Sequence, residues 1–174
     1  MPISVNLSKR DLYDNNYLER YKKIQERYQV PSHLLEIEFT ETLFFENLEL
    51  LKHSIDEVHD AGYLCSIDDF GSGYSSLSLL KEIPVDILKL DKSFFDNMDN
   101  SRADKVVEHV IALAKDLDIA TIAEGIETVI QVERLKKMKC DLIQGYVYYK
   151  PMSIGDFNKI VENNYKVISI FKDE

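Results

Sequence analysis

Apolar residues along this chain follow two different periods. Short runs rich in aliphatic residues end at a polar group or a turn, which is typical of strands, and between most of them apolar residues recur at helical spacing. Alternating strands and helices predict an α/β fold with parallel strands. The six runs that we expect to form strands are residues 3–7, 34–40, 63–67, 86–90, 119–123 and 142–146.

The predicted helices are defined by apolar residues that share one face. A first helix over residues 11–28 is expected to end before Pro31, because proline disfavours helical geometry in the residue before it. We interpret the apolar and aromatic residues of that helix as core residues rather than a surface for stacking on bases. The three apolar faces are Leu12, Leu18, Tyr21, Ile24 and Tyr28, then Leu48, Leu51, Ile55 and Val58, and finally Val106, Val110, Leu113 and Leu117.

Length and composition limit the classes of function. The 174 residues, 45% of them hydrophobic, suit one domain, which we draw over residues 1–174. The formal net charge of −10 argues against binding to a DNA or RNA duplex or to an anionic membrane surface. No apolar stretch is long enough to span a membrane and no secretion signal is evident. A phosphate-bearing substrate would need metal ions to offset the negative charge.

Cysteine and histidine form no recognisable metal motif in the sequence. Cys65 and Cys140 lie in or near apolar strands without partners at a metal-ligand spacing, and so few cysteines lead us to expect a reducing, cytoplasmic setting. The four histidines precede a strand or lie in predicted helices, so we expect them to face solvent and assign them no ligand role. They are His33, His53, His59 and His109.

Polar side chains stand near the carboxyl ends of the predicted strands. In residues 34–40, Glu36 and Glu38 alternate with apolar residues and so occupy one face of the strand. Because ligands of parallel α/β sheets bind at the carboxyl ends of the strands, we expect these polar groups to converge. The converging residues are Asn6, Glu38, Asp68, Asp69, Lys89, Glu124 and Gln144.

The chemistry of this set suits hard divalent cations. Carboxylate and amide oxygens are the ligands that Mg²⁺ and Mn²⁺ prefer. With Asp68 bridging, two ions about 4 Å apart would activate water and stabilise the leaving oxygen of a phosphodiester. Each residue alone has a structural alternative: Asp69 could cap a turn or helix, and Lys89 could pair with Asp91 or Asp86. The coincidence of several such strand ends favours a site.

Two other motifs overlap the acidic pair. Asp69, Phe70 and Gly71 spell the metal motif of protein kinases, but the chain has no glycine-rich nucleotide loop and no His-Arg-Asp loop. The glycines at positions 71 and 73 lack the third glycine of a dinucleotide fingerprint. Neither alternative accounts for the other strand ends.

Six motifs, in this order and at this spacing, resemble the EAL-domain cyclic-di-GMP phosphodiesterases over essentially the whole chain. The resemblance implies a TIM-barrel-like EAL fold, and a hydrolase of bacterial second-messenger signalling that converts cyclic-di-GMP to linear 5′-pGpG with Mg²⁺ or Mn²⁺. The motifs are Val5-Asn6-Leu7-Ser8, Glu38-Phe39-Thr40-Glu41, the Asp-Asp-Phe-Gly-Ser-Gly-Tyr-Ser-Ser-Leu of residues 68–77, Lys89-Leu90-Asp91, Ala123-Glu124-Gly125-Ile126-Glu127-Thr128 and Gln144-Gly145-Tyr146.

The same resemblance implies a role for each matched residue. Lys89 would orient or deprotonate the nucleophilic water, and Gln144 would hydrogen-bond near it. Glu41 would brace the loop of residues 70–76, which links dimerisation to activity in the family, and Glu127 would contact substrate or support the site. The implied metal ligands are Asn6, Glu38, Asp68, Asp69 and Glu124.

The chain departs from the family in the motif that names it. No Glu-Ala-Leu occurs, although its Glu is a metal ligand in the family, and we expect only about six of the eight strands of a closed barrel of about 250 residues. We therefore expect weak or no activity from this chain alone. Its exposed strand edges would be covered by a second copy, another chain or residues 167–171. The alternatives are a noncatalytic module that binds cyclic-di-GMP or a protein, and a natural start upstream of Met1.

Overall fold

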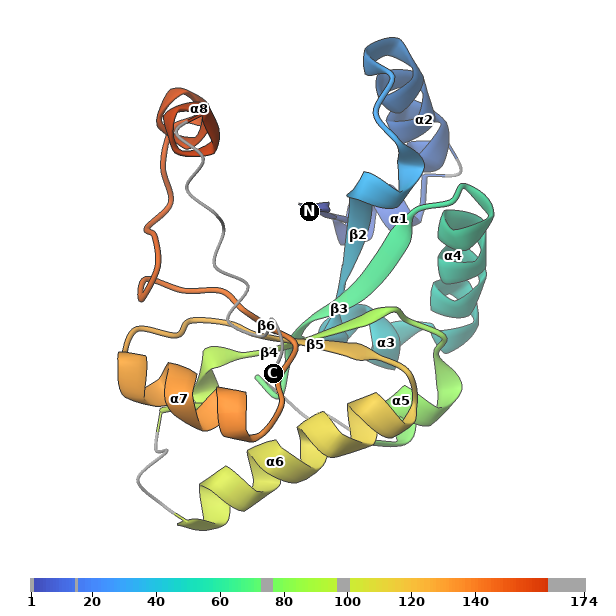
Figure 1. Cartoon of the computed structure of the whole chain (residues 1–174). Helices are drawn as coiled ribbons and strands as arrows, with labels where there is room; N and C mark the ends of the chain where they lie inside the picture. The colour runs from blue at the N-terminus through green and yellow to red at the C-terminus, as the bar shows by residue number, and fades with distance from the viewer. Residues whose placement is uncertain (1, 15, 73–76, 97–100, 163–174) are drawn as a thin grey trace.

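The computed structural model describes residues 2–14, 16–72, 77–96 and 101–162, and these contain a curved sheet of six parallel strands. The strands stand in chain order, each beside the next one in the sequence, so the sheet forms half of a barrel (Figure 1). All six expected strands are confirmed. Their bounds are β1 (Ile3–Asn6), β2 (Leu35–Thr40), β3 (Leu64–Phe70), β4 (Ile87–Leu90), β5 (Ala120–Ala123) and β6 (Leu142–Ile143).

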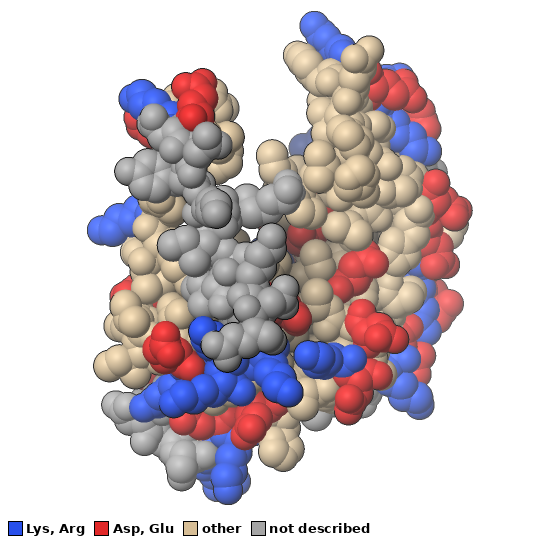
Figure 2. Space-filling view, viewed as in Figure 1, with Lys and Arg blue, Asp and Glu red and all other residues tan. Residues whose placement is uncertain are grey.

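Helices connect consecutive strands, and several of them cover the outer face of the sheet. In α4 the side chains of Leu51, Ile55 and Val58 are fully buried, as the periodicity predicts. Helices α2 and α8 stand away from the sheet at its two ends, and the molecule is hollowed between them (Figures 1 and 2). The helices are α1 (Lys9–Leu12), α2 (Tyr17–Tyr28), α3 (Glu41–Glu46), α4 (Leu48–Asp60), α5 (Leu77–Glu82), α6 (Ser101–Asp116), α7 (Val129–Lys137) and α8 (Ile154–Glu162), with short 3₁₀ turns at Ser32–Leu34 and Lys92–Phe94.

The single helix expected over residues 11–28 is wrong, because the structure divides it into α1 and α2. Between them the Asp14 carboxylate accepts a hydrogen bond from the backbone N–H of Asn16, at 3.0 Å. Such a local side-chain contact gives the backbone an alternative to helical hydrogen bonding. The expectation of a core face is also only partly correct: Leu12 and Leu18 are buried, whereas Ile24 and Tyr28 are 59% and 65% exposed.

Helix α6 buries a face that overlaps only partly with the expected one. Val110 is buried and Leu113 is partly buried against the core, as expected, whereas Val106 and Leu117, which follows the helix, are 50% and 42% exposed. The buried set keeps the i, i+3, i+4, i+7 spacing of an amphipathic helix, so the period was correct and the buried face lies to one side of the expected one. Its members are Val107, Val110, Ile111 and Ala114.

The outer strands of the described sheet, β1 and β6, each have one described neighbour. Ile3 of β1 is 63% exposed and Leu142 of β6 is 50% exposed, so both edges present apolar surface. The extra strand expected at residues 167–171 lies outside the described residues. None of the helices in the described ranges is long and apolar enough to cross a membrane.

Candidate active site

Lys89 lies at the centre of the polar face of the half-barrel, with only 4% of its surface exposed. Its ammonium contacts three carboxylates from three other strand ends: Glu38 of β2 at 2.6 Å, Asp68 of β3 at 3.0 Å and Glu124, which follows β5, at 2.8 Å. The partners considered from sequence are engaged elsewhere: Asp91 accepts a hydrogen bond from Ser93 N and Asp86 contacts His59. The parallel sheet thus brings residues up to 86 positions apart to one point.

Lys89 and the carboxylates around it shift one another's pKa values. Burial opposes the charge of Lys89, but its hydrogen bonds to Glu124, Glu38 and Asp68 outweigh burial and raise the lysine pKa above its usual value. Burial also raises the pKa of Glu124, and the contact with Lys89 only partly offsets that effect. Lys89 is therefore an ammonium at neutral pH, and it serves as the counter-ion of the three carboxylates.

A β-bulge explains how two consecutive acids reach one site. In a regular strand Asp68 and Asp69 would point to opposite faces of the sheet. The pairing of β3 with β4 shifts register between Ile67 and Phe70, and Asp69 takes a left-handed backbone conformation with φ 57°. The extra residue turns the strand locally, as bulges do. Asp68 and Asp69 consequently face the same space.

The carboxylate cluster fits a divalent cation. Asp68, Asp69 and Glu124 each offer an oxygen, and these oxygens all lie within 4.8 Å of one another. Burial, followed by the negative charges of Asp68 and Asp91, raises the pKa of Asp69. The single charge of Lys89 leaves this group of acids with an excess of negative charge. Oxygen donors and uncompensated charge are what Mg²⁺ and Mn²⁺ require of a protein site.

Glu36 adds a further buried carboxylate, nearer the amino end of β2 than Glu38. It is 5% exposed, it precedes Glu38 by two positions on the same face of β2, and its Oε1 has no hydrogen-bond partner among the described residues. Burial raises its pKa above the usual value. The sequence pattern placed Glu36 on the polar face of the strand, but it gave no sign that the carboxylate would be almost fully enclosed.

Asn6 and Glu41 lie at the same edge of the sheet. Asn6, the last residue of β1, is in register with Glu38, so its side chain belongs to the same edge as the cluster. Glu41 begins α3 and is 4% exposed, and its carboxylate accepts a hydrogen bond from the backbone N–H of Gly71 at 3.0 Å. That contact ties the start of the 70–76 loop to α3; residues 73–76 of the loop lie outside the described residues.

Glu127 and Gln144 contribute to a cavity that Lys89 does not line. Both are exposed and line a cavity of about 650 Å³ that begins beside Gly125, the residue after Glu124. The backbone of Gln144 is fixed at the end of β5, because its N–H donates to the Ala123 carbonyl at 2.8 Å. The other lining residues include two cations and two aromatic rings, those of Lys92, Lys150, Tyr146 and Tyr149.

Comparison with known sequences gives consistent results. The chain is 32% identical over 154 residues to "Cyclic di-GMP phosphodiesterase NbdA" of Pseudomonas aeruginosa, covering 88% of this chain and 20% of that protein. It is 36% identical over 162 residues to "Probable cyclic di-GMP phosphodiesterase PdeB" of Escherichia coli, covering 93% of this chain and 31% of that protein. The chain therefore spans a fifth to a third of the length of these relatives.

Solved structures match the half-barrel directly. The EAL domain of Mycobacterium smegmatis DcpA superposes with a TM-score of 0.87 at 31% identity, covering 94% of this chain and 74% of that one. A manganese and cyclic-di-GMP complex of Klebsiella pneumoniae BlrP1 superposes with a TM-score of 0.79 at 27% identity, covering 84% of this chain and 38% of that one. The EAL domain family model matches residues 1–151. The chain belongs to the EAL domain family.

Proposed function

We propose that the carboxylate cluster is the catalytic centre of a cyclic-di-GMP phosphodiesterase, which hydrolyses one phosphodiester bond to give 5′-pGpG. The observation that carries this proposal is the convergence of Asp68, Asp69 and Glu124 within 4.8 Å of one another. The chain belongs to a family in which NbdA and PdeB are named phosphodiesterases of this substrate. The proposal also places the protein in the cytoplasm.

We assign the metal ligands from the geometry and the family resemblance together. Asp68, Asp69 and Glu124 supply the central oxygens, and Glu38 and Asn6 lie in register with each other on the adjoining strands. The cations, Mg²⁺ or Mn²⁺, would supply an activated water and stabilise the leaving oxygen of the phosphodiester. The protein's own part is to hold these oxygens close together at one edge of the sheet before substrate arrives.

Lys89 orients groups at this centre. As a buried ammonium it donates hydrogen bonds to Glu38 and Asp68 and forms an ion pair with Glu124, and so it fixes the directions of three proposed ligands. A protonated lysine has no free lone pair to accept a proton. We therefore assign Lys89 to orienting the nucleophilic water and the carboxylates rather than to deprotonating water.

The remaining residues hold the loop and the substrate. Glu41 braces the 70–76 loop through Gly71. Glu127 and Gln144 line the adjoining cavity, where the rings of Tyr146 and Tyr149 and the cations of Lys92 and Lys150 suit the bases and phosphates of a nucleotide. A cavity of about 650 Å³ is large enough to hold part of a cyclic dinucleotide.

A noncatalytic role is the second candidate. These 174 residues contain no Glu-Ala-Leu, and the edges at Ile3 and Leu142 are exposed. We propose that a second copy or another chain covers these edges, and that the chain alone has weak or no activity. In the second candidate the protein binds cyclic-di-GMP or a protein without turnover.

Binding and turnover, measured together, separate the two candidates. Purified chain is incubated with cyclic-di-GMP and Mn²⁺, binding is measured by calorimetry, and pGpG is measured by chromatography. If the chain is a phosphodiesterase, we expect it to bind cyclic-di-GMP only with metal present and to release pGpG slowly at most. Asp68→Asn should lose both properties. Binding that persists in chelator and in Asp68→Asn would favour the noncatalytic module, and fast release would overturn the expectation of weak activity.

A further inference from the structure

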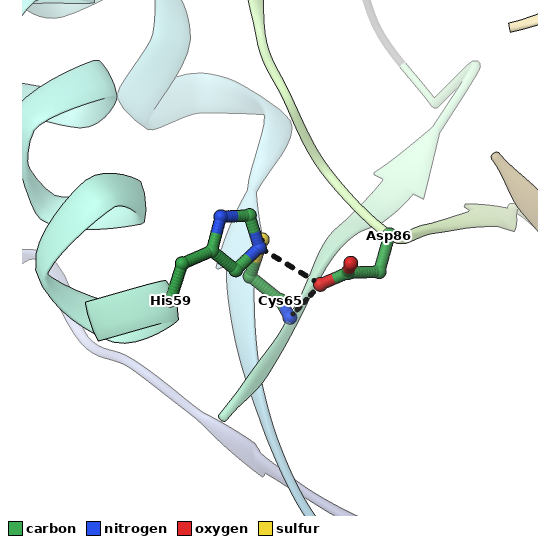
Figure 3. Close-up of side chains that lie close together, drawn as sticks. All are labelled: His59, Cys65 and Asp86. Carbon is green, nitrogen blue, oxygen red and sulfur yellow. Dashed lines mark hydrogen bonds and ion pairs between the residues drawn. The ribbon is translucent and has the colours of Figure 1, made fainter. Parts of the chain in front are cut away.

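A second group of potential metal ligands lies at the opposite edge of the sheet. His59 stands near the end of α4, Cys65 is the second residue of β3, and Asp86 directly precedes β4. In Figure 3 the three side chains point toward one another from these elements. The amino ends of parallel strands meet here, so this group is separate from the carboxylate cluster. From the sequence we expected His59 to face solvent and found no metal partner for Cys65; in the structure the His59 side chain is 34% exposed and contacts both Cys65 and Asp86.

The distances within this group are short. The His59 Nε2 atom lies 3.0 Å from Asp86 Oδ2 and 3.3 Å from the Cys65 sulfur. The backbone N–H of Cys65 donates to the same Asp86 oxygen at 2.8 Å, which holds the carboxylate in place. The three ligand atoms all lie within 4.8 Å of one another. One sulfur, one nitrogen and one oxygen therefore surround a common point.

We propose that His59, Cys65 and Asp86 form a binding site for Zn²⁺ or a similar borderline divalent cation, with solvent as the fourth ligand. In a tetrahedral zinc site, bond lengths of about 2.0–2.3 Å place nitrogen about 3.4 Å from oxygen and about 3.6 Å from sulfur. The observed separations of 3.0 and 3.3 Å are shorter by only a few tenths of an ångström. A small outward movement of the imidazole opens the site.

The exposure of the three residues supports an accessible site. Cys65 is fully buried, whereas the side chains of His59 and Asp86 are 34% and 35% exposed. A cation can therefore enter from the side of His59 and Asp86 and meet the sulfur at the bottom. On binding, the thiol proton leaves to solvent and the thiolate coordinates the cation.

The donor types set this site apart from the carboxylate cluster. Sulfur and imidazole favour zinc-like cations, whereas the all-oxygen cluster at the other edge suits Mg²⁺ and Mn²⁺. A bound cation would cross-link α4, β3 and β4, and would stabilise the fold without taking part in phosphodiester chemistry. The proposal is therefore independent of the proposed function.

Cobalt(II) provides the direct test, because a thiolate ligand gives it an intense charge-transfer absorption that oxygen ligands do not. Chelator-treated protein carrying Asp68→Asn and Asp69→Asn, which disables the oxygen cluster, is titrated with Co²⁺. We expect one equivalent to produce the band, and Zn²⁺ to remove it. His59→Ala and Cys65→Ser should weaken binding at least tenfold. Matched controls are His53→Ala, an exposed histidine on the same helix, and Cys140→Ser, the other buried cysteine.

A thermal measurement covers the case in which Cys65→Ser does not fold. Saturating Zn²⁺, at about 100 times its Kd, should raise the Tm of the oxygen-cluster variant by roughly 5–10 °C, and His59→Ala should lose most of that shift. A missing charge-transfer band, or an equal shift in the His59→Ala and His53→Ala backgrounds, would overturn the proposal. The three side chains would then form only a hydrogen-bonded link between α4 and the sheet.

Discussion

The ammonium of Lys89 lies 2.6 Å from the carboxylate of Glu38, and both side chains are buried. The pair joins β4 to β2 across β3, over 51 positions of sequence. Since Asp68 and Glu124 share the same ammonium, removing its charge leaves three acids without a counter-ion.

Lys89→Met is therefore expected to destabilise the metal-free chain by roughly 3–5 kcal/mol, as expected when one partner of a buried ion pair is removed. Urea unfolding in chelator measures this loss. Added Mn²⁺ should restore part of it, because a divalent ion replaces the missing positive charge. The control Lys52→Met, which breaks the surface pair with Glu82, should change stability little. Equal losses in the two variants would contradict the counter-ion role.

Asp69→Gly tests the bulge. A left-handed conformation costs an L-residue more than it costs glycine, and Asp69 also faces the charge of Asp68. We expect the metal-free chain to gain up to about 1 kcal/mol of unfolding free energy, while Mn²⁺ binding weakens at least tenfold.

Asp118→Gly is the matched control for this variant, since Asp118 has φ 59° and lies away from the cluster. It should relieve similar backbone strain without affecting Mn²⁺ binding. If both variants weakened Mn²⁺ binding equally, Asp69 would have no place among the ligands.

Gly71→Ala is expected to destabilise the chain by roughly 2–4 kcal/mol. A Cβ on Gly71 would lie 1.9 Å from the Phe94 ring, and the residue has φ +99°. Gly155→Ala is the control, because its Cβ would lie 3.9 Å from the nearest atom at the start of α8. Thermal unfolding of both variants compares them, and a Gly71→Ala Tm equal to that of the wild type would show that the loop does not pack as described.

The pH dependence of stability in Glu36→Gln tests whether the Glu36 carboxylate is enclosed. Burial raises the folded-state pKa of Glu36 above its ordinary value of 4.5, so the folded chain holds this proton more tightly than the unfolded chain. Ionised Glu36 therefore destabilises the fold as pH rises above about 4.5, and protonated Glu36 does not. In chelator, Glu36→Gln should be more stable than wild type at pH 7 and equal to it at pH 4.

The exposed residue Glu49 provides the control for this pH series. Because the Glu49 side chain is exposed to water, Glu49→Gln should not raise the stability at pH 7 as Glu36→Gln does. A Glu36→Gln difference that does not depend on pH would mean that the carboxylate is solvated in the folded protein.

Periodicity predicted the strands and their shared polar edge because strand ends are local properties of the sequence. It was only partly correct for the buried face of α6, and it missed the break between α1 and α2, where the Asp14 carboxylate contacts the Asn16 backbone. The alternating directions of side chains along a strand could not place Asp68 and Asp69 together, because the bulge that does so depends on how β3 pairs with β4. The group of His59, Cys65 and Asp86 was also missed, since three separate elements create it.

Mn²⁺ binding by the carboxylate cluster is the property that most directly tests its role as a metal site. Chelator-treated chain is titrated with Mn²⁺ by calorimetry, alongside Asp68→Asn and the control Asp118→Asn, an exposed acid outside the cluster. We expect binding by wild type and by Asp118→Asn, and an affinity for Mn²⁺ at least tenfold weaker in Asp68→Asn. Equal affinity in all three proteins would show that Asp68, Asp69 and Glu124 do not form the metal site.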